Sequence, residues 1–214
     1  MSTTFVREFE TRRGSLSLHQ IGIGDTGCVV WDAALVLSGY VHELDRREAK
    51  YWRNKTVLEL GAGTGVVGLV AACLGAHSTL TDLPKCLPLI EQNIEANKAL
   101  FDETGSAKAD ILIWGRGNAS SQAEIEIDVV LMSDLIYYEE SLGPLIETLE
   151  AVTSPRTLVL MSYEERESEM KRKLVAEFFD LFSRTFQWEK VDEANQDSRY
   201  QSDDIIVITA RKRK

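Results

Sequence analysis

The sequence TVLELGAGTGVVG at residues 56–68 decides the fold that we expect for this chain. Its first five residues favour β-structure. Gly61, Gly63 and Gly65 follow on alternate positions, and an apolar helical pattern begins after them. This order predicts a strand, a glycine-rich turn and a helix. Such a turn lets the backbone approach a ligand closely, and the N-terminal N–H groups of the helix can bind it.

The glycine spacing alone leaves two classes of cofactor open. The dinucleotide fingerprint G-x-G-x-x-G fails when it is counted from Gly61, but it fits from Gly63 through Gly65 to Gly68. A nucleotide-binding turn of either class is also followed, about 20 residues later, by an acidic residue for the ribose hydroxyls. Asp82 stands at that distance, at the end of the next expected strand. The alternative is a plain turn, with Asp82 capping the helix that follows.

The longer pattern E-L-G-x-G-x-G favours one of the two cofactors. With Glu59 two residues before Gly61, it resembles motif I of the class I, seven-stranded S-adenosylmethionine-dependent methyltransferases. The resemblance implies that the glycines lie under the methionine part of the cofactor. It also implies that Glu59 helps to fix the loop and the amino end of the cofactor.

A second segment, Asp134-Leu135-Ile136-Tyr137, follows the apolar run 129–132. It lacks both prolines of the N/D-P-P-Y motif, and it resembles the D/E-x-x-Y/F motif of the non-histone protein lysine methyltransferases. Together with residues 27–32 and 59–65, it looks closest to the members of that group that act on valosin-containing protein, a hexameric ATPase. The resemblance therefore implies a protein substrate, with valosin-containing protein or a related ATPase or chaperone as the expected partner.

By this resemblance, Asp134 positions the incoming lysine ammonium and orients its amine, and Tyr137 or Tyr138 walls the channel. The ring faces of the tyrosines could bind a methylated ammonium by cation–π attraction. The alternatives are a polar strand end for Asp134 and core packing for the tyrosines and for Trp31. The residues that the resemblance places against S-adenosylmethionine are Trp31, Glu59, Gly61, Ala62, Gly63, Asp82, Trp114, Ser133 and Tyr138.

Composition limits the class of protein. A chain of 214 residues suits a single domain, with a hairpin and linker at 1–24 and a catalytic core at 25–214. Its net charge of −10 argues against general nucleic-acid binding. The apolar run 66–76 is too short to span a bilayer. Three unpaired cysteines and scattered histidines predict no metal site.

We expect a monomer in the cytoplasm, since no pattern requires a dimer and no signal-peptide pattern is present. The basic residues 211–214 leave nuclear import open, with a solvated tail as the alternative.

Alternating strand and helix patterns predict an α/β fold, a doubly wound, Rossmann-like sheet of seven strands with a reversed C-terminal strand. A short N-terminal β-hairpin, expected as an edge element, precedes it, and Asp32 is expected to cap the first helix. Ligands bind such sheets at the carboxyl ends of the strands, where the candidate residues converge. The expected sheet strands are 56–60, 78–81, 109–113, 127–132, 157–161, 186–191 and 205–210, with Trp114 and Ser133 at the ends of the third and fourth. Helices are expected to begin at Ser141 and Glu165, and residues 115–124 are expected to form a surface loop.

Three other functions remain open on the sequence. A cofactor-binding interaction protein would have little turnover. A small-molecule methyltransferase would be expected to carry a lid over its pocket. A dehydrogenase would use Gly63, Gly65 and Gly68, but it would leave Glu59 and the segment around Asp134 unexplained.

Overall fold

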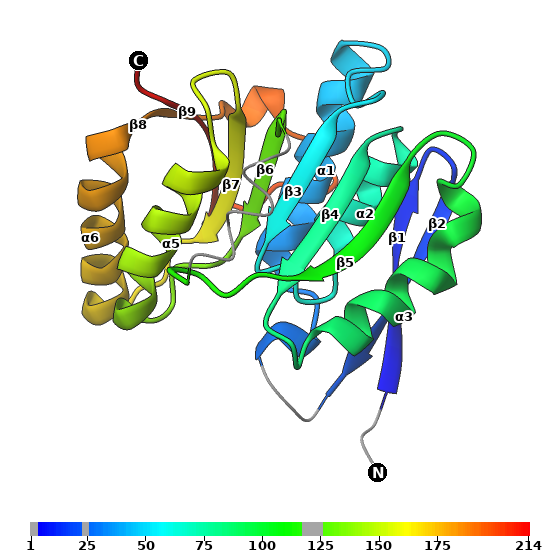
Figure 1. Ribbon diagram of the computed structural model, residues 1–214, viewed down its shortest axis with the longest axis horizontal. Helices are drawn as coiled ribbons and strands as arrows, with labels where there is room; N and C mark the ends of the chain where they lie inside the picture. Colours follow the sequence, from blue (N-terminus) through cyan, green and yellow to red (C-terminus); the bar gives the residue numbers. More distant parts are fainter. Residues whose placement is uncertain (1–3, 23–25, 117–125) are drawn as a thin grey trace.

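The computed structural model describes residues 4–22, 26–116 and 126–214. Its centre is a seven-stranded sheet in the order β5-β4-β3-β6-β7-β9-β8 (Figure 1). The first five of these strands are mutually parallel, and β9 is antiparallel to both of its neighbours. The strands are β3 Thr56–Leu60, β4 His77–Asp82, β5 Ser106–Ile111, β6 Val129–Ser133, β7 Leu158–Glu164, β8 Phe186–Lys190 and β9 Ile205–Lys212.

The chain runs outward from β3 to β5 and then returns to form β6 on the other side of β3. The strand order therefore reverses between β3 and β6, which is where doubly wound sheets bind their ligands. The predicted fold, with its reversed strand, is confirmed. The predicted strands 56–60, 78–81 and 186–191 agree with the observed ones to within one residue at each end.

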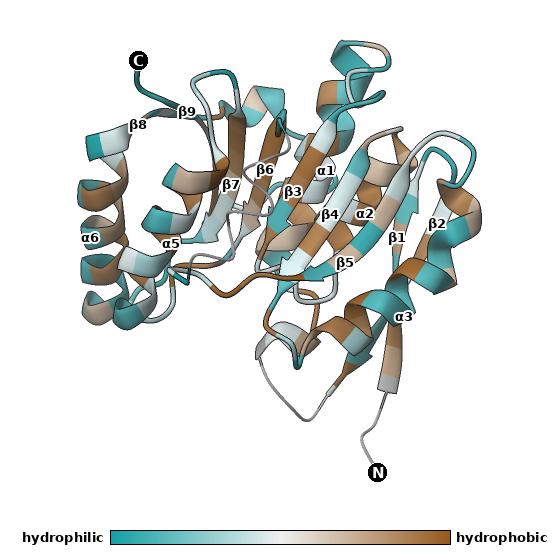
Figure 2. Ribbon diagram, viewed as in Figure 1, coloured by the Kyte–Doolittle hydropathy of each residue, from teal (hydrophilic) through white to brown (hydrophobic). Residues whose placement is uncertain are grey.

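Alternate residues of the central strands pack on opposite faces, as period-2 side-chain geometry requires. In β3, Val57 belongs to one hydrophobic cluster, and Leu58 and Leu60 belong to the other. Helices α1 (Asp32–Arg47), α2 (Val66–Cys73) and α3 (Leu87–Asn97) contribute to the first cluster, and α5 (Glu139–Val152) and α6 (Glu169–Thr185) contribute to the second. The central strands β6 and β7 are mainly hydrophobic, whereas the edge strand β5 mixes hydrophobic and hydrophilic residues (Figure 2).

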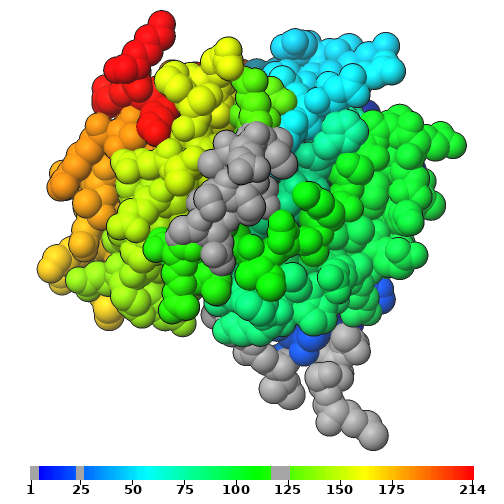
Figure 3. Space-filling view, in the orientation of Figure 1, coloured from blue at the N-terminus to red at the C-terminus, as the bar shows by residue number. Residues whose placement is uncertain are grey.

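The predicted N-terminal hairpin is confirmed as β1 (Thr4–Thr11) and β2 (Gly14–Ile21), but it is not an edge of the main sheet. It forms a two-stranded sheet of its own. The buried side-chain amides of Asn93 and Asn97 on α3 bind the backbone of β2, where a neighbouring strand would otherwise pair. Each amide accepts a hydrogen bond from a β2 N–H and donates one to a β2 carbonyl. The hairpin and the C-terminal end lie on opposite sides of the molecule (Figure 1), and most of the hairpin is hidden behind the face shown in Figure 3.

Several predicted boundaries were wrong. Trp31, not Asp32, is the N-cap residue of α1, and it makes no side-chain cap. Asp32 is the first helical residue, and its carboxylate accepts a hydrogen bond from Arg7 Nη2 at 3.4 Å. The strand expected at 109–113 is β5, which starts and ends earlier, because an edge strand needs no continuous apolar run. The predicted surface loop 115–124 lies mostly outside the described residues.

Two helices also begin elsewhere than expected. α5 begins at Glu139 rather than at Ser141, so Tyr138 is its N-cap residue. α6 begins at Glu169, where Ser168 Oγ accepts a hydrogen bond from the Lys171 N–H at 3.2 Å. In the part of the chain that the structure describes, no helix combines the length and the apolar character needed to cross a membrane.

The hydrogen bonds that attach the hairpin to α3, here called the tether, can be tested by substituting Asn93. Its side chain bonds both the N–H and the carbonyl of His19 and also the carbonyl of Thr64. Asn93→Ala should lower the free energy of unfolding by about 2–3 kcal/mol, because buried backbone groups lose their partners. Urea denaturation would measure this change. Gln92→Ala, at an exposed position of the same helix, is the control, and an equal effect of both variants would contradict the tether.

Candidate active site

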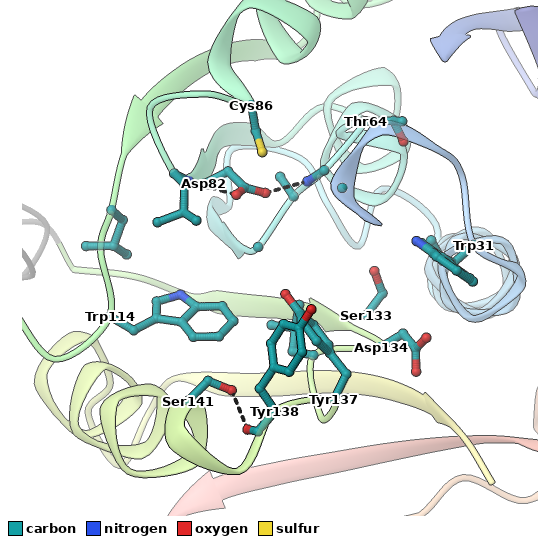
Figure 4. Close-up of a pocket in the computed structure, with 18 of the residues that line it drawn as sticks. Trp31, Thr64, Asp82, Cys86, Trp114, Ser133, Asp134, Tyr137, Tyr138 and Ser141 are labelled. Carbon is teal, nitrogen blue, oxygen red and sulfur yellow. Dashed lines mark hydrogen bonds between the residues drawn. The ribbon is translucent and has the colours of Figure 1, made fainter. Parts of the chain in front are cut away.

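A cavity of about 490 Å³ opens at the carboxyl ends of β3, β4 and β6. Its volume is in the usual range for small-molecule sites, about 300–1,000 Å³. The predicted site residues converge there from loops and strand ends far apart in the chain, and Figure 4 shows several of them. The predicted residues that line the cavity are Trp31, Gly61, Ala62, Gly63, Asp82, Trp114, Ser133, Asp134, Tyr137 and Tyr138.

The glycine loop is built for close approach. Gly61 and Gly63 have φ angles of 58° and 55°, in the left-handed region where a side chain is strained. A Cβ atom at Gly61 would lie 2.5 Å from Leu135 Cδ2, and one at Gly63 would lie 3.0 Å from the carbonyl oxygen of Gly27. The loop therefore presents bare backbone to the cavity, and a larger residue at either position would deform this wall.

Asp82 connects the loop to the neighbouring strand. Its Oδ2 accepts a hydrogen bond from the Gly63 N–H at 2.8 Å, and its Oδ1 accepts one from the Leu83 N–H at 2.7 Å. The helix-capping alternative is wrong, because α3 begins only at Leu87, with Cys86 as its N-cap residue. Each carboxylate oxygen retains a second lone pair. Asp82 can therefore accept hydrogen bonds from two ribose hydroxyls while it holds the loop.

Glu59 is the one predicted cofactor residue that does not line the cavity. It is 1% exposed, and its Oε2 accepts a hydrogen bond from the Gly68 N–H at 2.9 Å. The expected role in fixing the loop is therefore visible, whereas a direct contact with a ligand is not. A Cβ at Gly68 would lie 2.6 Å from Oε2, so this glycine makes room for the carboxylate. Burial raises the pKa of Glu59 from its ordinary value of 4.5 to about 8.

Aromatic side chains form much of the remaining wall. The rings of Tyr137 and Tyr138 meet edge to face, with their centroids 4.7 Å apart. Trp114 and Trp31 lie toward opposite ends of the cavity (Figure 4). Trp31 is 42% exposed and Tyr138 is 53% exposed, which is incompatible with core packing. Ser133 is the last residue of β6, as expected, whereas Trp114 lies beyond the end of β5.

Asp134 follows β6 directly and has a φ angle of 51°, which is uncommon for a residue other than glycine. Its backbone N–H donates to the carbonyl of Ser162 at 2.9 Å, so the turn is held by β7. Its Oδ2 accepts a hydrogen bond from Arg166 Nη2 at 2.7 Å. Burial raises the pKa of Asp134, and the Arg166 charge opposes that rise.

The sequence analysis missed the cations of the cavity wall, and two of them, Arg166 and Lys171, lie on the side of Asp134. Arg166 lies between β7 and α6, and Lys171 lies in the first turns of α6, where its Nζ donates to the Tyr137 carbonyl at 2.9 Å. Both belong to a stretch of alternating charges that resembles a solvated helix face. No local pattern separates these two residues from their neighbours, because only the packing of β7 and α6 beside β6 brings them to Asp134.

The cavity is compatible with a nucleoside cofactor that carries a charged amino-acid end. The glycine cradle leaves room for a group that a Cβ would exclude, and Asp82 offers free acceptor positions. Among the residues described, no three histidine, cysteine, aspartate or glutamate side chains are arranged to hold a metal ion. The sheet with its reversed β9 and this site together define a class I methyltransferase. The lysine methyltransferase family matches residues 11–185, and this chain belongs to that family.

Curated relatives and solved structures agree with this membership. EEF1A lysine methyltransferase 3 of Xenopus tropicalis is 37% identical over 64% of this chain, and the match covers 58% of that protein, less than two thirds of its length. Protein N-lysine methyltransferase METTL21A of Danio rerio is 36% identical over 87% of this chain and 78% of that protein. The T. thermophilus 16S rRNA N2 G1207 methyltransferase, solved with AdoMet and guanosine, shares the fold, with a TM-score of 0.63 and 18% identity over 100% of this chain and 52% of that one.

Family membership makes methyl transfer to lysine the reaction class and S-adenosylmethionine the methyl donor. It also resolves the choice between cofactors that the glycine spacing left open. Gly68, the third glycine of the dinucleotide pattern, accommodates Glu59 instead.

The buried Glu59 gives a testable pH dependence. Because its pKa is raised to about 8 in the folded protein, the folded state retains a proton that the unfolded state loses near 4.5. The wild type should therefore lose stability relative to Glu59→Gln as the pH rises between these values, by up to about 1.4 kcal/mol per pH unit. Urea denaturation at pH 5.5 and 8 would measure the difference. Glu91→Gln, exposed on α3, is the control, and a difference independent of pH would contradict the assignment.

Proposed function

We propose that this protein transfers a methyl group from S-adenosylmethionine, bound in the cavity, to a lysine side chain of a protein substrate. The observation that carries the proposal is the position of Asp134. It places a carboxylate in the cavity wall at the end of β6, the strand beside the one that leads into the glycine loop. A carboxylate at that position can bind an amine at the point where the two ligands meet.

The cofactor would be held mainly by the loop after β3 and by Asp82. The backbone of Gly61, Ala62 and Gly63 would lie under its methionine part, and Asp82 would bind the ribose hydroxyls. Trp114 and Ser133 would border the adenine, where an aromatic face and a small side chain leave a flat slot. When bound, S-adenosylmethionine supplies a methyl group attached to a positively charged sulfur.

The protein's own task is to deliver a neutral amine in line with that methyl group. Free lysine has a pKa of about 10.4, so the ammonium must lose a proton before it can react. The apolar walls of the cavity favour the neutral amine, because burial disfavours charge. Asp134 orients the amine by accepting an N–H, and the faces of Tyr137 and Tyr138 restrict its approach. The proton leaves to bulk water, and alignment is the main catalytic contribution.

The open mouth of the cavity favours a protein over a small molecule as substrate. Trp31 and Tyr138 line the cavity and are largely exposed, so a lysine could enter between them. Among the described residues, none from β1 or β2 lines the cavity, so the hairpin is not a lid over it. The resemblance of residues 27–32, 59–65 and 134–142 supports valosin-containing protein as the substrate. We also propose that this protein acts as a monomer, since no pattern in the sequence requires a dimer.

The decisive experiment is transfer of labelled methyl from S-adenosylmethionine to purified valosin-containing protein and to a whole-cell extract. Asp134→Ala should lower the transfer rate by about 10²-fold, because the amine loses its alignment, while cofactor binding survives. Asp102→Ala, exposed and remote from the cavity, is the control. Label in a different protein would support the proposed activity but would contradict valosin-containing protein as the substrate. No label in any protein would contradict the proposal.

The cofactor side is tested separately by calorimetry. Asp82→Ala should weaken S-adenosylmethionine binding by about 10–100-fold, since two charge-assisted hydrogen bonds are lost. Asp134→Ala should leave the dissociation constant within about twofold of the wild type. Equal losses in both variants would show that the two residues do not divide the site as proposed.

A further inference from the structure

Arg166 is the closest charged neighbour of Asp134. Its Nη2 lies 2.7 Å from Asp134 Oδ2 and 3.1 Å from Glu164 Oε2, and its Nε donates to the same Glu164 oxygen at 3.1 Å. The guanidinium also lies 5.9 Å from the centroid of the Trp31 ring. The Asp134 side chain is only 13% exposed and that of Arg166 is 31% exposed, so water screens this pair weakly.

This pairing bears on a conflict in the proposed reaction. A lone carboxylate would bind the lysine as an ammonium, and it would raise the pKa of the ammonium just where the reaction needs a neutral amine. A cation in direct contact with that carboxylate has the opposite effect. It leaves the oxygens available as hydrogen-bond acceptors, but it removes much of the attraction for a second positive charge.

We propose that Arg166 is a positioning residue whose charge lets Asp134 accept a hydrogen bond from the substrate amine without holding that amine in its protonated form. The inference rests on the proposed function. Arg166 does not touch the reacting atoms in this account. It acts through Asp134. The carboxylate of Glu164, which binds the same guanidinium, has the opposite electrostatic effect on Asp134.

Several other groups surround the pair of Asp134 and Arg166. Lys171 of α6 lies near enough to lower the pKa of Asp134, but it does so less than Arg166 does. From α1, the neighbouring group is the neutral Trp31 ring. The remaining titratable groups among the described residues of the cavity wall are Tyr137 and Tyr138 after β6, Glu140 on α5, and Asp82, Lys85 and Cys86 on the β4–α3 side.

Two variants with opposite expected signs test the inference. The acidic limb of the kcat–pH profile reports the ionisation of groups in the enzyme–substrate complex. Arg166→Gln removes the cation, so the limb should move to higher pH by about one unit, with activity recovering in alkaline buffer. Glu164→Gln should move it to lower pH by a smaller amount. Arg166→Lys, which keeps the charge, should keep the limb, and Arg184→Gln at the far end of α6 is the control.

The substrate in these assays is the protein that the wild type labels. A purely structural role for Arg166 would lower kcat in both variants without opposite shifts, and that result would overturn the inference while the proposed function stood. No methyl transfer by the wild type would overturn both.

A second readout needs no turnover. The Asp134 carboxyl can be followed by carbon-13 NMR, with its signal identified by its loss in Asp134→Asn. In the absence of substrate, its pKa should rise in Arg166→Gln and fall in Glu164→Gln. Unchanged titration in both variants would show that the guanidinium does not control this carboxylate, and it would overturn the inference independently of the assay.

Discussion

The locked turn between β3 and α2 is the constraint on which the rest of the site depends. Gly61 and Gly63 adopt left-handed backbone angles, and the turn is held on both sides by carboxylates. Asp82 binds the Gly63 N–H from the end of β4, and Glu59 binds the Gly68 N–H from within β3. Both carboxyl groups accept hydrogen bonds from backbone donors near the start of a helix, where such groups have no partner within the helix. Contacts within the protein therefore fix the conformation of the cavity floor.

The two buried carboxylates of the site solve different problems. Among the described residues no cation is paired with Glu59, so burial raises its pKa far enough for it to carry a proton near neutral pH. In that form it can support the turn without adding charge beneath the cofactor. Burial also disfavours the charged form of Asp134, but the charge of Arg166 opposes this effect and favours the carboxylate. Neighbouring strands of one sheet thus carry one carboxyl that serves as structure and one that faces the substrate.

Specificity for a large substrate follows from how the mouth is built. The helix after β6 starts at Glu139, so Tyr138 stands at its N-cap position and projects toward the cavity instead of joining the core. Trp31 occupies the same position at the start of α1. Both rings are held by helix starts, and helix starts are positioned by packing against the sheet. The opening is therefore defined by two helix starts, those of α1 and α5.

The sequence by itself determined the sheet, the glycine turn and ten of the residues that line the cavity, because these depend on local spacing. Strands, glycine turns and the residues at strand ends can be recognised from residues that are close together in the sequence, as residues 56–68 and Asp82 show. Only the tertiary structure decided that Glu59 lies beneath the turn and not in the cavity, that the hairpin packs on α3 and not on the sheet, and that Arg166 meets Asp134. Each of these facts depends on contacts between segments that are distant in the sequence, and such contacts produce no periodic pattern of residues.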